Sequence, residues 1–222
     1  MRKWLAGFAR SQHRPRVDGR PPRLSAGERV YAVGDVHGRL DLLRETEALI
    51  ARDLEAAPPS GSVLKVFLGD YVDRGPDSSG VLDHLSRARG TPEPPICLMG
   101  NHDWWFHDFL EGGEPALAWL GSGGDATLTS YGVTEWPPLD DRDAWARLRT
   151  RLRRRVPGEH RRFLHGLARQ ARRGDYLFAH AGIRPGLPLD DQDPRDLLFI
   201  REPFLSDNGE LGVVVVHGHT VV

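Results

Sequence analysis

Five short polar clusters hold the residues of this sequence that are best suited to bind a metal ion. The first, residues 34–38, reads GDVHG and pairs Asp35 with His37. If the preceding strand continues through the cluster, both side chains project to one side, because alternate residues of a strand share a face. Oxygen and nitrogen donors of this kind suit Mn, Fe, Zn and similar divalent ions. Taken alone, an exposed turn explains the cluster about as well.

The second and third clusters add donors and a proton-transfer group. Residues 69–75 read GDYVDRG, with Asp70 directly after an apolar run and Asp73 beside Arg74. Residues 100–103 read GNHD, where Asn101 offers a neutral carbonyl oxygen and His102 exchanges protons near neutral pH. The alternatives are an exposed salt-bridged turn for the second cluster and helix capping by Asn101 for the third, although capping can coexist with metal binding.

Two histidine clusters follow, each directly after a short apolar run. They read AHAG at 179–182, with His180, and HGHT at 217–220, with His217 and His219. A single histidine in such a place is usually structural, and packing is the favoured interpretation of His217. Five apolar runs that each end in a potential metal ligand are hard to explain by coincidence, because little else in the chain is arranged in this way. The joint pattern predicts one metal-binding site.

The elements that must position these clusters have the pattern of parallel strands. Apolar runs at 30–34, 63–69 and 96–100 each end in glycine and a polar cluster, which is typical of buried strands. Helical patterns at 40–54 and 78–88 separate them, so the order predicts an α/β fold with crossover helices. The clusters would then gather at the carboxyl edge of the sheet, where open α/β sheets bind ligands.

The remaining segments are expected to surround this sheet. Residues 1–28 are rich in Arg, Pro and Gly and are predicted to form a flexible basic leader before a domain at 29–222. Residues 104–172 are mostly helical in pattern and indicate an inserted cap. Further strands are predicted at 176–179, near 197–200 and at 212–216. The glycine cluster at 121–124 is interpreted as a turn, and Trp104 and Trp105 either shape a substrate groove or pack inside the cap.

Composition narrows the class of protein. The 222 residues are 39% hydrophobic and 27% charged, as in ordinary globular domains, and the net charge of -1 gives no sign of a nucleic-acid or membrane partner. The apolar part of the N-terminus is too short for a signal peptide. Cys97 is the single cysteine, so no internal disulfide can form. We expect a cytoplasmic protein that binds neither nucleic acid nor membrane.

In the order and spacing of these motifs the sequence resembles the phosphoprotein-phosphatase branch of the calcineurin-like metallophosphoesterases, most of all its bacterial and phage members. The matching motifs are GDVHG, GDYVDRG and GNHD, followed by HAG at 180–182, IRE at 200–202 and GHT at 218–220. They cover about residues 30–220. The resemblance implies a four-layer α/β/β/α sandwich with a helical cap insertion. The family pattern continues past GHT with strands that close the second sheet, so C-terminal strands are expected to be missing from this sequence.

The resemblance also implies two divalent metal ions, with Mn²⁺ as the family-based choice and Fe or Zn as alternatives. Six residues would hold them: Asp35 and His37 bind one ion, Asp70 bridges both, and Asn101, His180 and His219 bind the other.

Five further assignments follow from the resemblance and concern the substrate. Arg74, Arg201 and Asn101 would bind the phosphate, His102 would act as the general acid, and Asp73 would orient that histidine.

The implied reaction is hydrolysis of a phosphate ester by in-line attack of a hydroxide that the two ions activate. A serine/threonine protein phosphatase is favoured, because the diadenosine-tetraphosphate hydrolase branch usually lacks the acidic residue found here as Asp73 and tends to replace Thr220. A hydrolase of diadenosine tetraphosphate or of small phosphoesters is the alternative. A non-catalytic metal-binding scaffold is a third interpretation.

Overall fold

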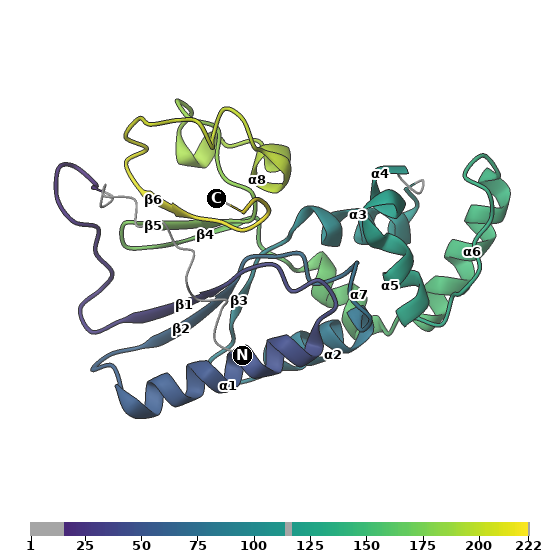
Figure 1. The fold of residues 1–222 in the computed structure, drawn as a ribbon, viewed down its shortest axis with the longest axis horizontal. Helices are drawn as coiled ribbons and strands as arrows, with labels where there is room; N and C mark the ends of the chain where they lie inside the picture. The colour runs from purple at the N-terminus through teal and green to yellow at the C-terminus, as the bar shows by residue number, and fades with distance from the viewer. Residues whose placement is uncertain (1–15, 114–116, 222) are drawn as a thin grey trace.

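The computed structural model describes residues 16–113 and 117–221 and has two three-stranded sheets at its centre (Figure 1). The first sheet contains β1 (Arg29–Val33), β2 (Val63–Phe67) and β3 (Ile96–Cys97), all parallel and in chain order. The crossover helices α1 (Leu40–Ala56) and α2 (Ser78–Ala88) cover its outer face. The predicted alternation of strand and helix is therefore confirmed over this part of the chain.

The second sheet lies against the inner face of the first. It contains β4 (Gln170–Arg173), β5 (Tyr176–Ala179) and β6 (Val214–Val216), with β4 antiparallel and β6 parallel to β5. Apolar side chains of both sheets form a joint core, in which Val66, Leu68 and Leu98 meet Phe178. Helix α8 (Pro194–Phe199) covers the outer face, so the order of layers is the predicted α/β/β/α sandwich (Figure 1).

Most of the remaining helices extend to one side of the sandwich (Figure 1). They are α3 (Asn101–Glu111), α4 (Leu117–Trp119), a π-helical turn η1 (Leu120–Gly124), α5 (Asp125–Ser130), α6 (Arg142–Arg155) and α7 (Gly158–His165). A short 3-10 helix, η2 (Leu189–Asp191), precedes α8. Phe106, Phe109, Trp119 and Trp145 are buried together at the centre of this helical region. Its treatment as a separate cap at 104–172 stays a prediction.

Two local predictions were wrong. The run near 197–200 forms part of helix α8 instead of a strand. Asp193 caps this helix by accepting a hydrogen bond from the backbone of Arg195 (2.8 Å), and Pro194 occupies the first turn, where its missing N–H costs nothing. Strand β4, which overlaps the end of the predicted helical segment 104–172, was not predicted, because its sequence QARR carries no apolar alternation.

Residues 16–28, which fall within the predicted leader, contact the β4–β5 hairpin. Val17 is buried, the Arg20 guanidinium pairs with Asp175 at 2.5 and 3.1 Å, and the backbone N–H of Arg23 donates to the same carboxylate. The first half of the predicted leader, residues 1–15, lies outside the described residues. The domain boundary near residue 29 stays a prediction. No helix within 16–113 or 117–221 is long and apolar enough to cross a bilayer.

Candidate metal centre

The polar clusters meet where the strands end, around the carboxylate of Asp70. This side chain follows β2 and is only 1% exposed. Its Oδ2 lies 3.7 Å from His37 Nε2, which comes from the segment after β1, and 3.4 Å from His180 Nε2, which comes from the segment after β5. Three segments that are distant in sequence thus place one carboxylate between two imidazoles.

The other predicted ligands lie in the same cluster. Asn101 Oδ1, at the start of α3, is 3.0 Å from His180 Nε2 and 2.9 Å from His219 Nδ1. Asp35 accepts a hydrogen bond from the backbone N–H of His219 at 3.1 Å and lies 3.9 Å from His37 Nε2. The structure therefore brings together all six residues that the resemblance assigns to metal binding.

The orientation of two histidines fits a metal site. His37 Nδ1 lies 2.9 Å from the carbonyl oxygen of Val72, and His180 Nδ1 lies 2.9 Å from that of Leu68. A carbonyl oxygen only accepts, so Nδ1 must be the donor in each case and Nε2 is directed at the cluster, the usual arrangement of metal-binding histidines. Within the described residues, two triads have ligand atoms within 4.8 Å of one another: His37, Asp70 and His102, and Asp70, His180 and His219.

His102 belongs to one of these triads, yet one of its ring nitrogens is already engaged. Nδ1 lies 2.6 Å from Asp73 Oδ2, and both residues are almost completely buried. The other ring nitrogen, Nε2, faces the cluster, 4.0 Å from Asp70 Oδ2 and 3.2 Å from Arg74 Nη2. The pair has the geometry of a carboxylate that orients an imidazole for proton transfer.

Two residues that the sequence did not single out hold Asp73 in place. Thr127 Oγ1 donates to Asp73 Oδ1 at 2.6 Å, and the indole N–H of Trp119 donates to Oδ2 at 2.8 Å. Both are fully buried and lie in the helical region after α3. Their residue types are common in cores, so only the fold reveals that they support the Asp73–His102 pair.

A third missed residue, Asp103, joins the second and third clusters. Its carboxylate accepts hydrogen bonds from the backbone N–H groups of Asp70 (2.7 Å), Tyr71 (2.9 Å) and Gly100 (2.9 Å). The turn after β2 is thereby tied to the start of α3. The GNHD motif was visible in the sequence, but the role of its last residue depends on this pairing of loops.

The two predicted phosphate-binding arginines lie at opposite ends of the cluster. Arg74 Nη1 is 2.8 Å from His37 Nε2 and its Nη2 is 3.2 Å from His102 Nε2. Arg201 Nε is 3.4 Å from His219 Nε2. The glycine cluster expected to be a turn is the π-helical turn η1, and it positions Arg74, whose backbone N–H donates to the carbonyl of Gly123 at 3.0 Å.

Backbone strain is concentrated at the same place. Among the described residues, six that are not glycine have a positive φ, and five of them are site candidates: His37, Asp70, Asp73, Arg74 and His219. Side chains other than glycine rarely adopt this region, and each instance costs about 1–3 kcal/mol unless the surroundings impose it. Gly100 shows how close the segments lie, because a Cβ there would be 2.1 Å from Asp70 Oδ1.

Comparison with known proteins identifies the family. The profile of the family described as "Calcineurin-like phosphoesterase" matches residues 28–222. The chain belongs to this family. The fold described above is thus the fold of this family. His217, which has no matching role, contacts Phe204 with ring centroids 5.1 Å apart, and Thr220 Oγ1 is buried without a hydrogen-bond partner among the described residues.

Individual relatives carry two kinds of name. "Serine/threonine-protein phosphatase 1" of Salmonella typhimurium is 34% identical over 96 residues, which cover 43% of this chain and 39% of the relative. "Bis(5'-nucleosyl)-tetraphosphatase, symmetrical" of Acidovorax sp. is 33% identical over 156 residues, 70% of this chain and 44% of the relative. The chain thus spans less than half the length of these relatives. A solved serine/threonine phosphatase of Saccharomyces cerevisiae overlaps 79% of this chain and 49% of its own, with 17% identity and a TM-score of 0.42.

Asp70 and the histidines around it shift one another's pKa values. Burial disfavours its carboxylate, but His180, His102 and His37 outweigh that effect and lower the pKa of Asp70. Burial likewise disfavours the imidazolium of His180, yet the nearby Asp70 raises the pKa of His180 to about 9. Burial and the neighbouring His180 lower the pKa of His219 to about 4. At neutral pH these shifts favour an imidazolium at His180 and a neutral imidazole at His219.

This charge distribution predicts that metal binding releases a proton. A divalent ion bound at His180 Nε2 must displace the proton that the imidazole carries below a pKa of about 9. We expect the affinity for Mn²⁺ to rise with pH, by up to about tenfold per pH unit, and to level off above about pH 9. Competition with a fluorescent chelator calibrated at each pH measures this. An affinity that falls or stays constant between about pH 6.5 and 8.5 would contradict the assignment.

The support of Asp73 generates a second prediction. Thr127→Val keeps the shape of the side chain but removes the hydrogen bond to Asp73 Oδ1, so a buried carboxylate oxygen loses a donor. The free energy of unfolding should fall by about 1.5–3 kcal/mol, as for hydrogen bonds to charged groups. Urea unfolding provides the measurement, and Thr127→Ser, which retains the hydroxyl, serves as the control. Equal stability of the valine variant and the wild type would show that Thr127 does not support Asp73.

Proposed function

We propose that the protein is a metal-dependent phosphoester hydrolase that removes phosphate from phosphoserine and phosphothreonine in proteins. One observation carries the proposal: the buried pair of His102 Nδ1 and Asp73 Oδ2, 2.6 Å apart, beside the Asp70 cluster and within reach of Arg74. With Nδ1 held by Asp73, the imidazole presents Nε2 to the place where a phosphate would bind, and a proton on that nitrogen would go to the leaving group.

The chemistry of the leaving group explains why this pair favours a protein substrate. Cleavage of a serine or threonine phosphate expels an alkoxide, which is strongly basic and departs easily only if it receives a proton. Cleavage of a dinucleoside polyphosphate expels a phosphate chain, which needs no proton at neutral pH. A positioned general acid contributes about 10²–10⁴ in rate where the leaving group requires it. The Asp73–His102 pair therefore suits a phosphate monoester of an alcohol.

The donor set of the cluster fits two divalent cations, and Mn²⁺ is our proposal for their identity. Asp35, His37 and Asp70 would hold one ion, and Asp70 would share the other with the remaining predicted ligands: Asn101, His180 and His219. When bound, such ions neutralise charge on a phosphate and make water a stronger nucleophile. A cytoplasmic location belongs to the proposal as well, because the single cysteine, Cys97, is buried and unpaired.

The arginines would position the substrate. Guanidinium groups bind phosphate oxygens in bidentate fashion and stabilise charge that shifts during the reaction. Arg74 lies directly beside His102, and Arg201 lies beside His219 at the other end of the cluster. A phosphate bound between the two arginines, with its ester oxygen on the Arg74 side, would have that oxygen close to His102.

A second candidate is the hydrolysis of dinucleoside tetraphosphates. The observation in its favour is the Acidovorax relative of that name, whose similarity extends over 70% of this chain. In that reaction His102 would be less important, which makes the two candidates distinguishable.

A substrate panel tests the proposal. We expect phosphoserine and phosphothreonine peptides to be hydrolysed with a higher kcat/KM than phosphotyrosine peptides or diadenosine tetraphosphate. EDTA should abolish activity, and Mn²⁺ should restore it. Turnover confined to the dinucleotide would replace the protein-phosphatase proposal by the second candidate. No turnover of any substrate by the Mn²⁺-loaded protein would favour a metal-binding scaffold.

His102→Asn separates the role of proton donor from that of metal ligand. For a phosphoserine peptide, kcat should fall by about 10²–10⁴ because the alkoxide loses its acid. For p-nitrophenyl phosphate, whose leaving group is weakly basic, the loss should be much smaller. The Mn²⁺ content, measured by mass spectrometry of the metal, should match the wild type. Loss of metal would instead show that His102 acts as a ligand in the triad with His37 and Asp70.

A further inference from the structure

A partly apolar pocket of 570 Å³ lies between helices α3 and α8. Its walls include Trp104 and Trp105 from α3, Leu198 and Phe199 from α8, and the side chain of Arg169. A pocket of this size accommodates one or two amino-acid side chains or a small ligand.

Both helices that form the pocket adjoin residues of the candidate centre. Helix α3 begins at Asn101, and the ring of Trp105 contacts that of His102, with centroids 5.1 Å apart. At the end of α8, Phe199 lies two residues before Arg201. His102 is the residue that faces the leaving group in the proposed function, so this pocket adjoins the leaving-group side of the substrate.

Three aromatic rings of the pocket remain partly exposed. Phe199 makes T-shaped contacts with Trp104 and Trp105, with centroids 5.9 and 5.5 Å apart. By contrast, Trp119 and Trp145 in the neighbouring helical region are buried to 0% and 2% exposure. Aromatic groups left open in a concave site are available to bind an apolar or aromatic partner.

Arg169 gives the pocket its charge. The guanidinium is partly buried, and burial lowers its pKa. Its one hydrogen bond to another described residue runs from Nη1 to the sulfur of Met99, at 2.8 Å. Within 16–113 and 117–221 it makes no salt bridge. A partly buried guanidinium without a carboxylate partner would be stabilised by a bound anion. At the rim, Asp193 and Arg195 carry opposite charges.

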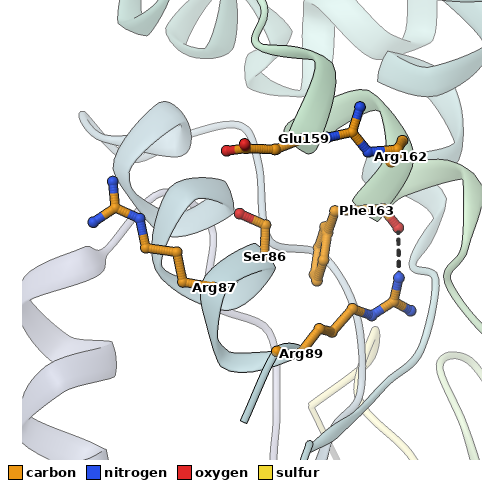
Figure 2. A pocket seen from close by; sticks show the side chains of 7 residues that line it. Ser86, Arg87, Arg89, Glu159, Arg162 and Phe163 are labelled. Carbon is orange, nitrogen blue, oxygen red and sulfur yellow. Dashed lines mark hydrogen bonds between the residues drawn. The ribbon is translucent and has the colours of Figure 1, made fainter.

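A second pocket of 470 Å³, between α2 and α7, is also lined by arginines, but its Arg89 is bound differently (Figure 2). There, Arg89 donates to the carbonyl oxygens of Phe163 and Gly166 and stacks on the ring of Phe163. Arg89 thus donates to two backbone oxygens, whereas Arg169 donates to no oxygen of the described residues.

We propose that the pocket between α3 and α8 binds the residues next to the phosphorylated one in a phosphopeptide, with an aromatic side chain against the exposed faces of Trp104, Trp105 and Phe199 and an adjoining acidic side chain at Arg169. This inference rests on the proposed protein-phosphatase function and gives it a sequence preference. The aromatic side chain fills the apolar space, and the carboxylate pairs with the guanidinium in a charge-assisted hydrogen bond.

Four phosphoserine peptides of equal length test the preference. They carry Phe and Asp, Ala and Asp, Phe and Asn, or Ala and Asn, directly after the phosphoserine in one series and directly before it in another. We expect the Phe and Asp peptide of one series to have the lowest KM. Arg169→Ala should lower its kcat/KM by about tenfold, as for the loss of a hydrogen bond to a charged group, and should affect the Ala and Asn peptide little.

Two further variants sharpen the test. Trp104→Ala should remove the advantage of Phe over Ala while the preference for Asp remains. Arg162→Ala, which truncates an exposed arginine of the pocket in Figure 2, is the matched control and should change no preference. Arg169→Glu should reverse the charge preference, favouring a peptide with Lys in place of Asp.

The outcomes separate this inference from the function on which it rests. Equal turnover of all four peptides, or a preference that Arg169→Ala leaves intact, would overturn the pocket assignment while the protein-phosphatase proposal stands. Hydrolysis of p-nitrophenyl phosphate without hydrolysis of any peptide would overturn both. An effect of Arg169→Ala on diadenosine tetraphosphate alone would reassign the pocket to a nucleotide.

Discussion

The buried carboxylate of Asp70 determines how the residues of the candidate metal centre are arranged. Asp70 is almost completely buried, and it stays ionised because imidazoles from three other segments lie within 4.0 Å of it and the backbone N–H of His102 donates to it. An isolated carboxylate in such a place would cost several kcal/mol and would take up a proton instead. The neighbouring segments must therefore converge on it in the folded state.

That convergence is supported by an uncommon backbone. Consecutive residues of the turn after β2, Asp73 and Arg74, both have positive φ, and so does Asp70. Strain of this kind persists only where the surrounding structure over-determines it. Here Asp103 binds the N–H groups of the turn from one side, and Thr127 and Trp119 hold Asp73 from the other. The helical region therefore both surrounds the centre and stabilises its strained turn, through Thr127 and Trp119.

The sequence reveals the centre more completely than its supports. Ligands at the ends of parallel strands are recognisable because an apolar run, a glycine and a polar group occur together, and the sheet then determines where they meet. Residues such as Thr127 and Trp119 give no such signal, since hydroxyls and indoles occur throughout protein cores. Their contacts with Asp73 span 54 and 46 residues and arise only when the helical region packs against the turn.

The errors in secondary structure have local causes. The apolar residues of α8 fit a strand or a helix over so short a length, and the capping residue Asp193 with Pro194 decides between them. The polar strand β4 is specified by its antiparallel partner β5 and not by its own pattern. In both cases information outside the run determines the element, which is why periodicity alone fails.

The separation of the ligands along the chain also bears on how the protein is made. The hydrogen bond between His219 and Asp35 closes a loop of 184 residues, and such long-range contacts form late in folding. A nascent polypeptide would therefore be unable to bind the ions until the segment that carries His219 has emerged and docked. Ions that bind only the completed arrangement then add to its stability by mass action, so that metal supply and maturation are thermodynamically linked.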